Sequence, residues 1–194
     1  MRQLSARLRT PRANGPRYPS PGHRPGDERA ENPPRAEGPR YHGVMPQSLS
    51  LLLVHLVFST KDRAPVLDPI VRSELFAYLA SVARNAGCEC YTAGGVADHV
   101  HLAVRLSRTL TLAKLVEELK TSSSKWLKAQ SPKLAGFSWQ SGYGAFSVSP
   151  SGLQSVRHYI DSQEEHHRKR TFEEEYRGFL QRYGIEFDER YLWD

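Results

Sequence analysis

Cysteine and long hydrophobic runs are scarce in this chain of 194 residues. The two cysteines, Cys88 and Cys90, are separated by one residue, which is too close for an ordinary disulfide bond. The longest apolar segment, residues 49–58 (LSLLLVHLVF), has about half the length that spans a bilayer, and the N-terminus lacks the apolar region of a secretory signal. These absences predict a protein of a reducing cytoplasm that does not insert into a membrane.

Lysine is missing from residues 1–44, which hold eight of the thirteen prolines and nine arginines. This composition, without aliphatic periodicity, predicts a disordered extension. Met45 is a candidate for the true translation start, in which case residues 1–44 would be an upstream extension of the reading frame. The extension carries most of the net charge of +6, so the overall basicity is weak support for DNA binding by the rest. We expect a folded domain over residues 45–170 and a C-terminal helix and tail over residues 171–194.

Hydrophobic patterns after residue 45 predict strands and helices in alternation. The expected elements are a strand at 49–59, a helix at 69–85 after Asp68 and Pro69, strands at 88–93 and 98–106 with a turn at Gly94 and Gly95, a helix from 112, a strand at 143–148, a helix from Ser149 or Ser151 to about His166, and a short helix opened by a Thr171–Glu174 capping box. This order predicts an α+β fold with a ferredoxin-like antiparallel sheet and helices packed mainly on one face.

The segment AGGVADHVHLAVRL, residues 93–106, places two histidines in an apolar strand. Side chains alternate along a strand, so Val100 and Leu102 share one face while His99 and His101 share the other. The pair is compatible with metal ligands and equally with two hydrogen-bonded, half-buried imidazoles. His55, in the first strand, is interpreted as a buried structural histidine and not as a ligand.

On the helix that follows Ser149, Tyr159 and Gln163 are four residues apart and therefore share a face. From this helix alone, a tyrosine at the rim of a helix interface is the simpler interpretation. Tyr159 and Gln163 indicate a functional site only in combination with His99 and His101.

From about residue 53 to residue 163 the chain resembles the single-tyrosine HUH transposases, which include small insertion-sequence enzymes and REP-associated tyrosine transposases. The resemblance depends on the order and spacing of five motifs: HLVFSTKDR, DHVHLAV, ELKTSSSKWL, FSWQSGYGAFSV and VRHYIDSQ. It implies that Tyr159 is the nucleophile and that His99, His101 and Gln163 bind a divalent metal, Mg²⁺ or Mn²⁺. It further implies a homodimer joined through its sheets.

The chemistry of these residue types supports that expectation. Three neutral ligands leave the full charge of a metal available to polarise a phosphate. A phenol, with a pKa of about 10, is a good leaving group, so a phosphotyrosine bond can be attacked again by a DNA 3′-hydroxyl. We therefore expect metal-dependent cleavage of single-stranded DNA, and strand transfer through a 5′-phosphotyrosine, at the bacterial nucleoid.

Two alternatives stay open at this point. A chain that has lost catalysis would be a DNA-hairpin-binding protein. If the hairpin turns at Gly94 and Gly95, the cysteines lie opposite the histidines and could form a structural zinc site of Cys88, Cys90, His99 and His101.

Substrate contacts and assembly are also suggested by composition. The candidates for phosphate contacts are Lys61, Arg63, Arg105, Lys114, Lys125 and Lys128, and Trp126, Trp139 and Tyr143 are either stacking platforms for unpaired bases or core residues. Residues 49–58 are apolar on both faces, which fits the implied homodimer but fits a central strand nearly as well.

Overall fold

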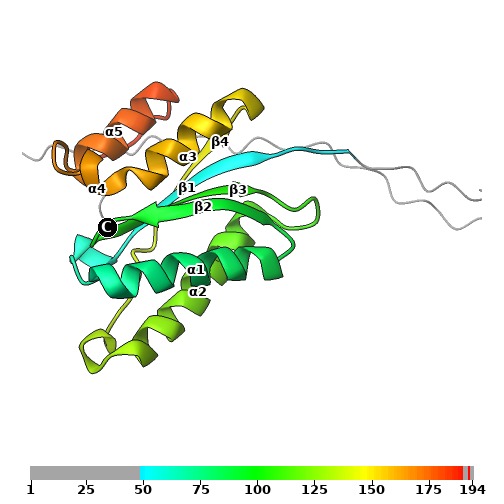
Figure 1. Ribbon diagram of the computed structural model, residues 1–194. Coiled ribbons are helices and arrows are strands. Elements are labelled where there is room, and N and C mark those ends of the chain that lie inside the picture. The colour runs from blue at the N-terminus through cyan, green and yellow to red at the C-terminus, as the bar shows by residue number, and fades with distance from the viewer. Residues whose placement is uncertain (1–48, 190–191, 193–194) are drawn as a thin grey trace, which may run out of the picture. The chain divides into compact units, whose positions relative to one another are not determined.

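Four strands form one antiparallel sheet in the order β2-β3-β1-β4 (Figure 1). The structure, a computed structural model, describes residues 49–189 and residue 192, so the predicted extension at residues 1–44 lies outside it. The strands are β1 (Leu53–Ser59), β2 (Glu89–Gly95), β3 (His99–Arg105) and β4 (Gly144–Val148), and the α-helices are α1 (Pro69–Asn85), α2 (Leu112–Gln130), α3 (Leu153–Asp161), α4 (Gln163–His166) and α5 (Phe172–Arg182). Short 3-10 turns lie at Lys61–Arg63 (η1), Pro132–Leu134 (η2) and Pro150–Gly152 (η3). The α+β, ferredoxin-like prediction is confirmed by this order of elements and strands.

Helices lie on both faces of the sheet (Figure 1). The two longest, α1 and α2, cover one face around a core that includes Leu56, Phe58 and Leu102. The shorter α3, α4 and α5 lie over the other face, where Val57 and Phe146 meet α5. The predicted layer of helices on one face is therefore present as α1 and α2. A second layer, α3 to α5, covers the other face, to which the β3 histidines point.

The starts of the two long helices follow local capping rules. The Asp68 carboxylate accepts hydrogen bonds from the first backbone N–H groups of α1, and Pro69 occupies the first helical position. The Thr111 hydroxyl accepts a bond from the backbone N–H of Lys114 at the start of α2.

Among the described residues, no helix is both long enough and apolar enough to cross a membrane.

The apolar strand β1 lies in the interior of the sheet, between β3 and β4. Its Leu56 and Phe58 side chains enter the core beneath α1 and α2, and Val57 packs against Phe146 on the opposite face. Both faces of β1 are thus covered within one chain. Its composition needs no second protomer to explain it.

The β2–β3 hairpin turns at residues 96–98, later in the chain than expected. Gly94 pairs with His101 in the ladder instead of forming the turn. The cysteines join the core on the α1 side, whereas the β3 histidines point to the other face. The structural zinc site of Cys88, Cys90, His99 and His101 is therefore wrong, because the two residue types lie on opposite faces of the sheet.

The helix expected to run to about His166 is divided at Ser162. The Ser162 backbone (φ −98°, ψ 15°) leaves the helical conformation, and its N–H donates to the carbonyl oxygen of His158. The chain resumes a helical course as α4, and Gln163 is buried. The chain reverses only after α4, over residues 167–171, and leads into α5 (Figure 1).

Helix α3 approaches β2 closely at Gly94. A Cβ atom at this position would lie 2.6 Å from the carbonyl oxygen of Ile160 and 2.9 Å from its Cγ2. The first of these atoms belongs to the backbone, which cannot rotate out of the way. Glycine therefore sets the distance between β2 and the helix that carries Tyr159.

We expect Gly94→Ala to lower the free energy of unfolding by about 1–3 kcal/mol, because the added methyl group must push α3 away from the sheet. Urea denaturation followed by circular dichroism measures the change. Gly136→Ala is the matched control, since nothing lies within 4 Å of a Cβ atom built there. Equal stabilities of the two variants would contradict the close approach at Gly94.

Candidate active site

Two histidines of β3 form the floor of the site. His99 and His101 are fully buried, and their rings contact residues of the covering layer formed by α3, α4 and α5: His99 contacts His167 and Phe172, and His101 contacts Tyr159. The Nδ1 atom of His99 lies 2.7 Å from a carboxylate oxygen of Asp98, and the Nδ1 atom of His101 lies 2.9 Å from Nε2 of His55. Partners of this kind orient an imidazole and leave its Nε2 atom for another contact. His55 is thus the buried histidine that the sequence suggested, bonded to His101.

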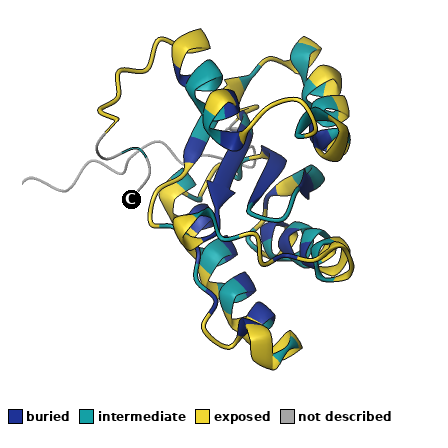
Figure 2. Cartoon of the chain, turned by 90° about the vertical axis from the view of Figure 1, so that its left-hand side faces the viewer, coloured by how far each residue is buried: buried dark blue, intermediate teal, exposed yellow. Residues whose placement is uncertain are grey.

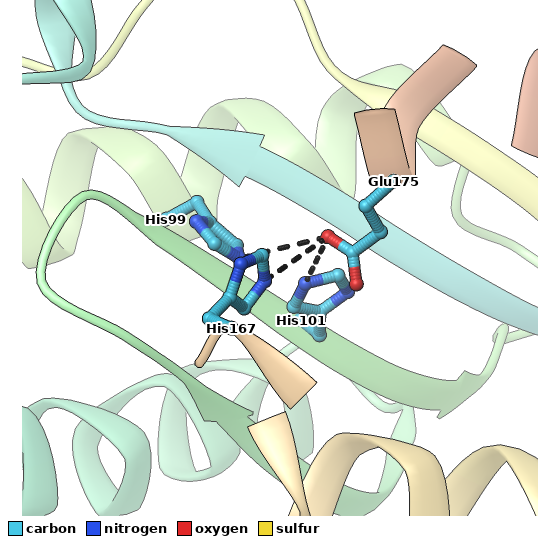
Figure 3. A group of neighbouring side chains, drawn as sticks. All are labelled: His99, His101, His167 and Glu175. Carbon is cyan, nitrogen blue, oxygen red and sulfur yellow. Dashed lines mark ion pairs between the residues drawn. The ribbon is translucent and has the colours of Figure 1, made fainter. Parts of the chain in front are cut away.

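The segment after α3 brings two further groups to this floor. Glu175 projects from α5, and His167 follows α4 (Figure 3). One carboxylate oxygen of Glu175, Oε2, lies 3.8 Å from Nε2 of His99, 3.6 Å from Nε2 of His101 and 3.3 Å from Nε2 of His167. One donor atom from each of the four residues lies within 4.8 Å of the others.

Gln163, the third ligand expected from the resemblance, lies beside this group. Its side-chain oxygen is 3.4 Å from Nε2 of His99, and its amide nitrogen donates to Oε1 of Glu175 at 3.1 Å. The structure therefore brings His99, His101 and Gln163 together, as the sequence predicted. It adds a histidine and a carboxylate that the sequence analysis did not assign.

The contacts between Glu175 and the histidines are ion pairs only if the imidazoles are protonated, and burial opposes that. Burial lowers the pKa of His101 well below its ordinary value and, together with nearby His99, lowers the pKa of His167 to about 4. Burial also raises the pKa of the Glu175 carboxyl to about 7. The imidazoles of His101 and His167 are therefore neutral near pH 7 and can offer lone pairs.

Several of these inward-facing atoms lack hydrogen bonds. Nε2 of His101, Nε2 of His167 and Oε2 of Glu175 are buried without a partner. Buried polar atoms normally have one, because leaving an atom unsatisfied costs about 1–3 kcal/mol. Imidazole nitrogens and a carboxylate oxygen are ligands of divalent metals, so the residues present fit a metal ion.

Tyr159 lies next to the histidines of the same chain. Its ring centroid is 5.9 Å from that of His101 and 5.2 Å from that of His166. Its hydroxyl is buried and has no hydrogen-bond partner. The tyrosine and the histidine pair, separated by more than fifty residues in the sequence, thus form one site within a single protomer.

A cavity of about 230 Å³ lies beside Tyr159, with walls from α3 and α5. Arg170 and Arg182 contribute to its lining, and neither was among the DNA-contact candidates. Two cations beside the buried hydroxyl of Tyr159 are suited to an anionic chain such as a phosphate backbone.

None of the six cations predicted to contact DNA lines this cavity. Three of them form ion pairs: Arg63 with Glu173, Arg105 with Glu89 and Lys114 with Glu117. Lys61 is exposed in η1, and Lys125 and Lys128 are exposed on α2, the helix that covers the opposite face of the sheet. These residues belong to surfaces apart from Tyr159.

The aromatic candidates divide between core and surface. Trp139 is buried, and its indole N–H donates to Ser123 at 2.9 Å. Trp126 stacks on Tyr78, while Tyr143 is 39% exposed. Tyr143 alone of the three therefore keeps the exposure that a stacking platform needs.

A sequence signal for Glu175 was present in the spacing of α5. Phe172, Tyr176, Phe179 and Leu180 form the apolar stripe of this helix, and Glu175 lies among them and is buried. A carboxylate on the apolar face of a short amphipathic helix indicates a partner in the interior. His167 had no comparable signal, because its position depends on the course of the chain after Ser162.

Comparisons with known proteins indicate the family of the chain. The family model of IS200-like transposases matches residues 48–163. The ISDra2 transposase TnpA of Deinococcus radiodurans is 29% identical over 114 residues, which cover 56% of this chain and 81% of that protein. The crystal structure of a candidate transposase from Deinococcus radiodurans has 25% identity and a TM-score of 0.49 and covers 62% of this chain and 97% of that one. A REP-associated tyrosine transposase bound to a REP hairpin has 14% identity and a TM-score of 0.44 and covers 62% of this chain and 69% of that one.

Proposed function

Because the chain belongs to the IS200-like transposase family, we propose that it cleaves and rejoins single-stranded DNA, with Tyr159 as the nucleophile and a divalent metal at the histidine cluster. The single observation that carries this proposal is the buried, unpartnered hydroxyl of Tyr159 beside His101. Transposition of DNA is the activity of the family, and the individual residue roles are our inference. A DNA substrate places the activity at the bacterial nucleoid.

The metal would be held by the β3 histidines with help from the neighbouring groups, and Mn²⁺ or Mg²⁺ is the ion that the family resemblance implies. When bound, it would polarise a scissile phosphate and stabilise the charge that develops during transfer. Asp98 and His55 would hold the two imidazoles in the orientation that leaves Nε2 available. The protein's part is thus to fix neutral nitrogens in a site screened from bulk water.

Tyr159 would attack the phosphorus atom of the scissile phosphate through its hydroxyl oxygen. A bond forms between that oxygen and phosphorus, and the bond from phosphorus to the 3′-oxygen breaks, so that one DNA end leaves as a 3′-hydroxyl after taking up a proton. The phosphotyrosine keeps the energy of the broken bond. A second 3′-hydroxyl can then attack phosphorus and release the tyrosine.

Arg170 and Arg182 would bind phosphates of the DNA strand on either side of the cut. Both line the cavity beside Tyr159, and both are exposed, so they can reach a strand without desolvation of a buried charge. Unpaired DNA, in a single strand or at the foot of a hairpin, can bend a phosphate into such a cavity more easily than a duplex can.

We expect Tyr159→Phe to form no covalent adduct with a labelled single-stranded oligonucleotide taken from the flanks of its gene, because the nucleophilic oxygen is absent. The wild type should form the adduct with Mn²⁺ and lose it when EDTA removes the metal. Denaturing gel electrophoresis detects the product. Tyr143→Phe, which alters an exposed tyrosine, is the control and should retain the adduct. An adduct of equal yield from the Tyr159 variant would transfer the nucleophile to another tyrosine.

Replacing Arg170 and Arg182 together by glutamine should weaken DNA binding and reduce the slope of log affinity against log salt by about 1.4, roughly 0.7 for each lost phosphate contact on a single strand. The same variant should also lower adduct yield at saturating DNA, because the phosphate is held less well beside Tyr159. Lys125→Gln combined with Lys128→Gln is the comparison, and it should affect affinity alone, since α2 covers the other face. Unchanged adduct yield in the arginine variant would rule out its role at the cavity.

A homodimer stays a prediction from the family resemblance. The central position of β1 explains the apolar residues of that strand within one chain, whereas Leu49, Leu51 and Leu52 before it are exposed. Tyr159 lies beside the histidines of its own chain. Dimerisation would therefore serve the pairing of two DNA ends and not the completion of the site. Sedimentation equilibrium should give the mass of two protomers at micromolar concentration, and the mass of one protomer in an active sample would contradict the prediction.

A further inference from the structure

We propose that His167 and Glu175, which lie beyond the family-matched residues, bind the metal together with the two histidines of β3. The family match ends at residue 163, so the C-terminal segment would supply half of a four-ligand centre that the resemblance does not include. This inference rests on the proposed metal dependence, and it names the ligands and the class of ion.

The hydrogen bonds of two imidazoles determine which nitrogen carries the lone pair. Nδ1 of His167 lies 3.0 Å from the carbonyl oxygen of Arg170, which can only accept, so Nδ1 carries the proton. Nδ1 of His99 lies 2.7 Å from the Asp98 carboxylate, which likewise leads to a protonated Nδ1. In both rings Nε2 is left with a lone pair. Nε2 of His167 lies 3.3 Å from Oε2 of Glu175, and Nε2 of His99 lies 3.4 Å from the side-chain oxygen of Gln163 and 3.8 Å from Oε2 of Glu175.

The third imidazole is arranged in the same sense. Nδ1 of His101 can donate to Nε2 of His55 at 2.9 Å, which leaves Nε2 of His101 as an acceptor. That Nε2 atom is buried without a partner and lies 3.6 Å from Oε2 of Glu175. Three nitrogen lone pairs and a carboxylate oxygen therefore face one another. These electron-rich atoms repel one another unless a cation lies between them.

The separations favour a metal over a shared proton. A protonated imidazole bonded to a carboxylate would bring nitrogen and oxygen to about 2.7–2.9 Å. The three distances from Oε2 of Glu175 are 3.8, 3.6 and 3.3 Å, and none of them is a hydrogen bond. Ligands bonded at about 2.0–2.2 Å to one tetrahedral ion lie roughly 3.3–3.6 Å apart. The distances from Oε2 of Glu175 to Nε2 of His101 and of His167 are within that range, and all four donor atoms lie within 4.8 Å of one another.

Gln163 holds the carboxylate in this position. Its amide nitrogen donates to Oε1 of Glu175 at 3.1 Å, which turns the other oxygen towards the histidines. Ligating carboxylates are commonly fixed by such a second hydrogen bond. Gln163 therefore acts on the centre through Glu175, whatever further contact its own oxygen makes.

The donor set also indicates the class of ion. Three imidazole nitrogens and one carboxylate oxygen suit first-row transition metals such as Zn²⁺, Co²⁺ and Mn²⁺. Mg²⁺ prefers oxygen ligands and keeps several waters, for which this buried, nitrogen-rich group leaves little room. The C-terminal segment should thus raise affinity for transition metals over Mg²⁺.

Metal binding by the full chain, without DNA, tests the proposal. Isothermal titration of EDTA-stripped protein with Co²⁺ and with Zn²⁺ should show that Glu175→Gln and His167→Gln each weaken binding by about 100-fold or more, since loss of even an outer-shell partner of a ligand costs 10–100-fold. Glu174→Gln is the matched control, because glutamine preserves the capping box and the residue is exposed. Wild-type affinity in both ligand variants, with binding lost in His99→Ala, would overturn the proposal.

A measurement on the unaltered chain covers the case in which a variant does not fold. Zn²⁺ should shift the imidazole nitrogen signals of three histidines in a ¹⁵N-histidine spectrum if His167 is a ligand. A shift of only two histidines would overturn the proposal. Neither measurement involves cleavage. Failure of the ligand assignment would therefore leave the Tyr159 adduct intact, and absence of the adduct would leave the metal-binding result intact.

Discussion

Side-chain alternation along β3 is the constraint on which the rest of the molecule depends. The strand lies in the interior of the sheet, between β2 and β1, and helices cover both faces of the sheet, so all its residues but the last are buried (Figure 2). Its aliphatic residues complete the core beneath α1 and α2. Its imidazoles require a cover whose polar atoms they can use, and α3, α4 and α5 provide that cover.

The layer formed by α3, α4 and α5 encloses polar atoms that are uncommon in a purely structural interface. Beneath it lie the hydroxyl of Tyr159, the Nε2 atoms of His101, His166 and His167, and one carboxylate oxygen of Glu175, all buried and without hydrogen bonds. Each such atom costs about 1–3 kcal/mol when it is left unsatisfied, so their concentration in one place works against stability. A protein that retains this group does so for the chemistry that the atoms perform.

The carboxylate changes the electrostatic balance of the site. With neutral ligands alone, a divalent ion keeps two positive charges for the phosphate, whereas with Glu175 bound it keeps one. The carboxylate increases affinity for the ion and reduces its power to polarise a phosphate. Arg170 and Arg182, beside Tyr159, return positive charge to the place where the DNA backbone would lie.

Features that depend on neighbouring residues could be predicted from the sequence. The cap of α1 at Asp68, the capping box of Thr171 and Glu174, and the shared face of His99 and His101 follow from hydrogen bonds and dihedral angles within a few residues. The fold class followed as well, because the order of elements permits few topologies. These are local rules, and they hold before the chain is folded.

The sequence by itself thus determined the elements, the buried histidine pair and the tyrosine helix. Only the tertiary structure decided the rest. A register shift between Cys90 and Thr92 in β2 put the cysteines on the face opposite the histidines, because side chains alternate along a strand and one extra residue reverses the faces of the residues beyond it. The order of the strands placed β1 in the interior, and the reversal of the chain between α4 and α5 brought His167 and Glu175 to β3. Such contacts join residues far apart in the sequence, and no periodicity encodes the path that brings them together.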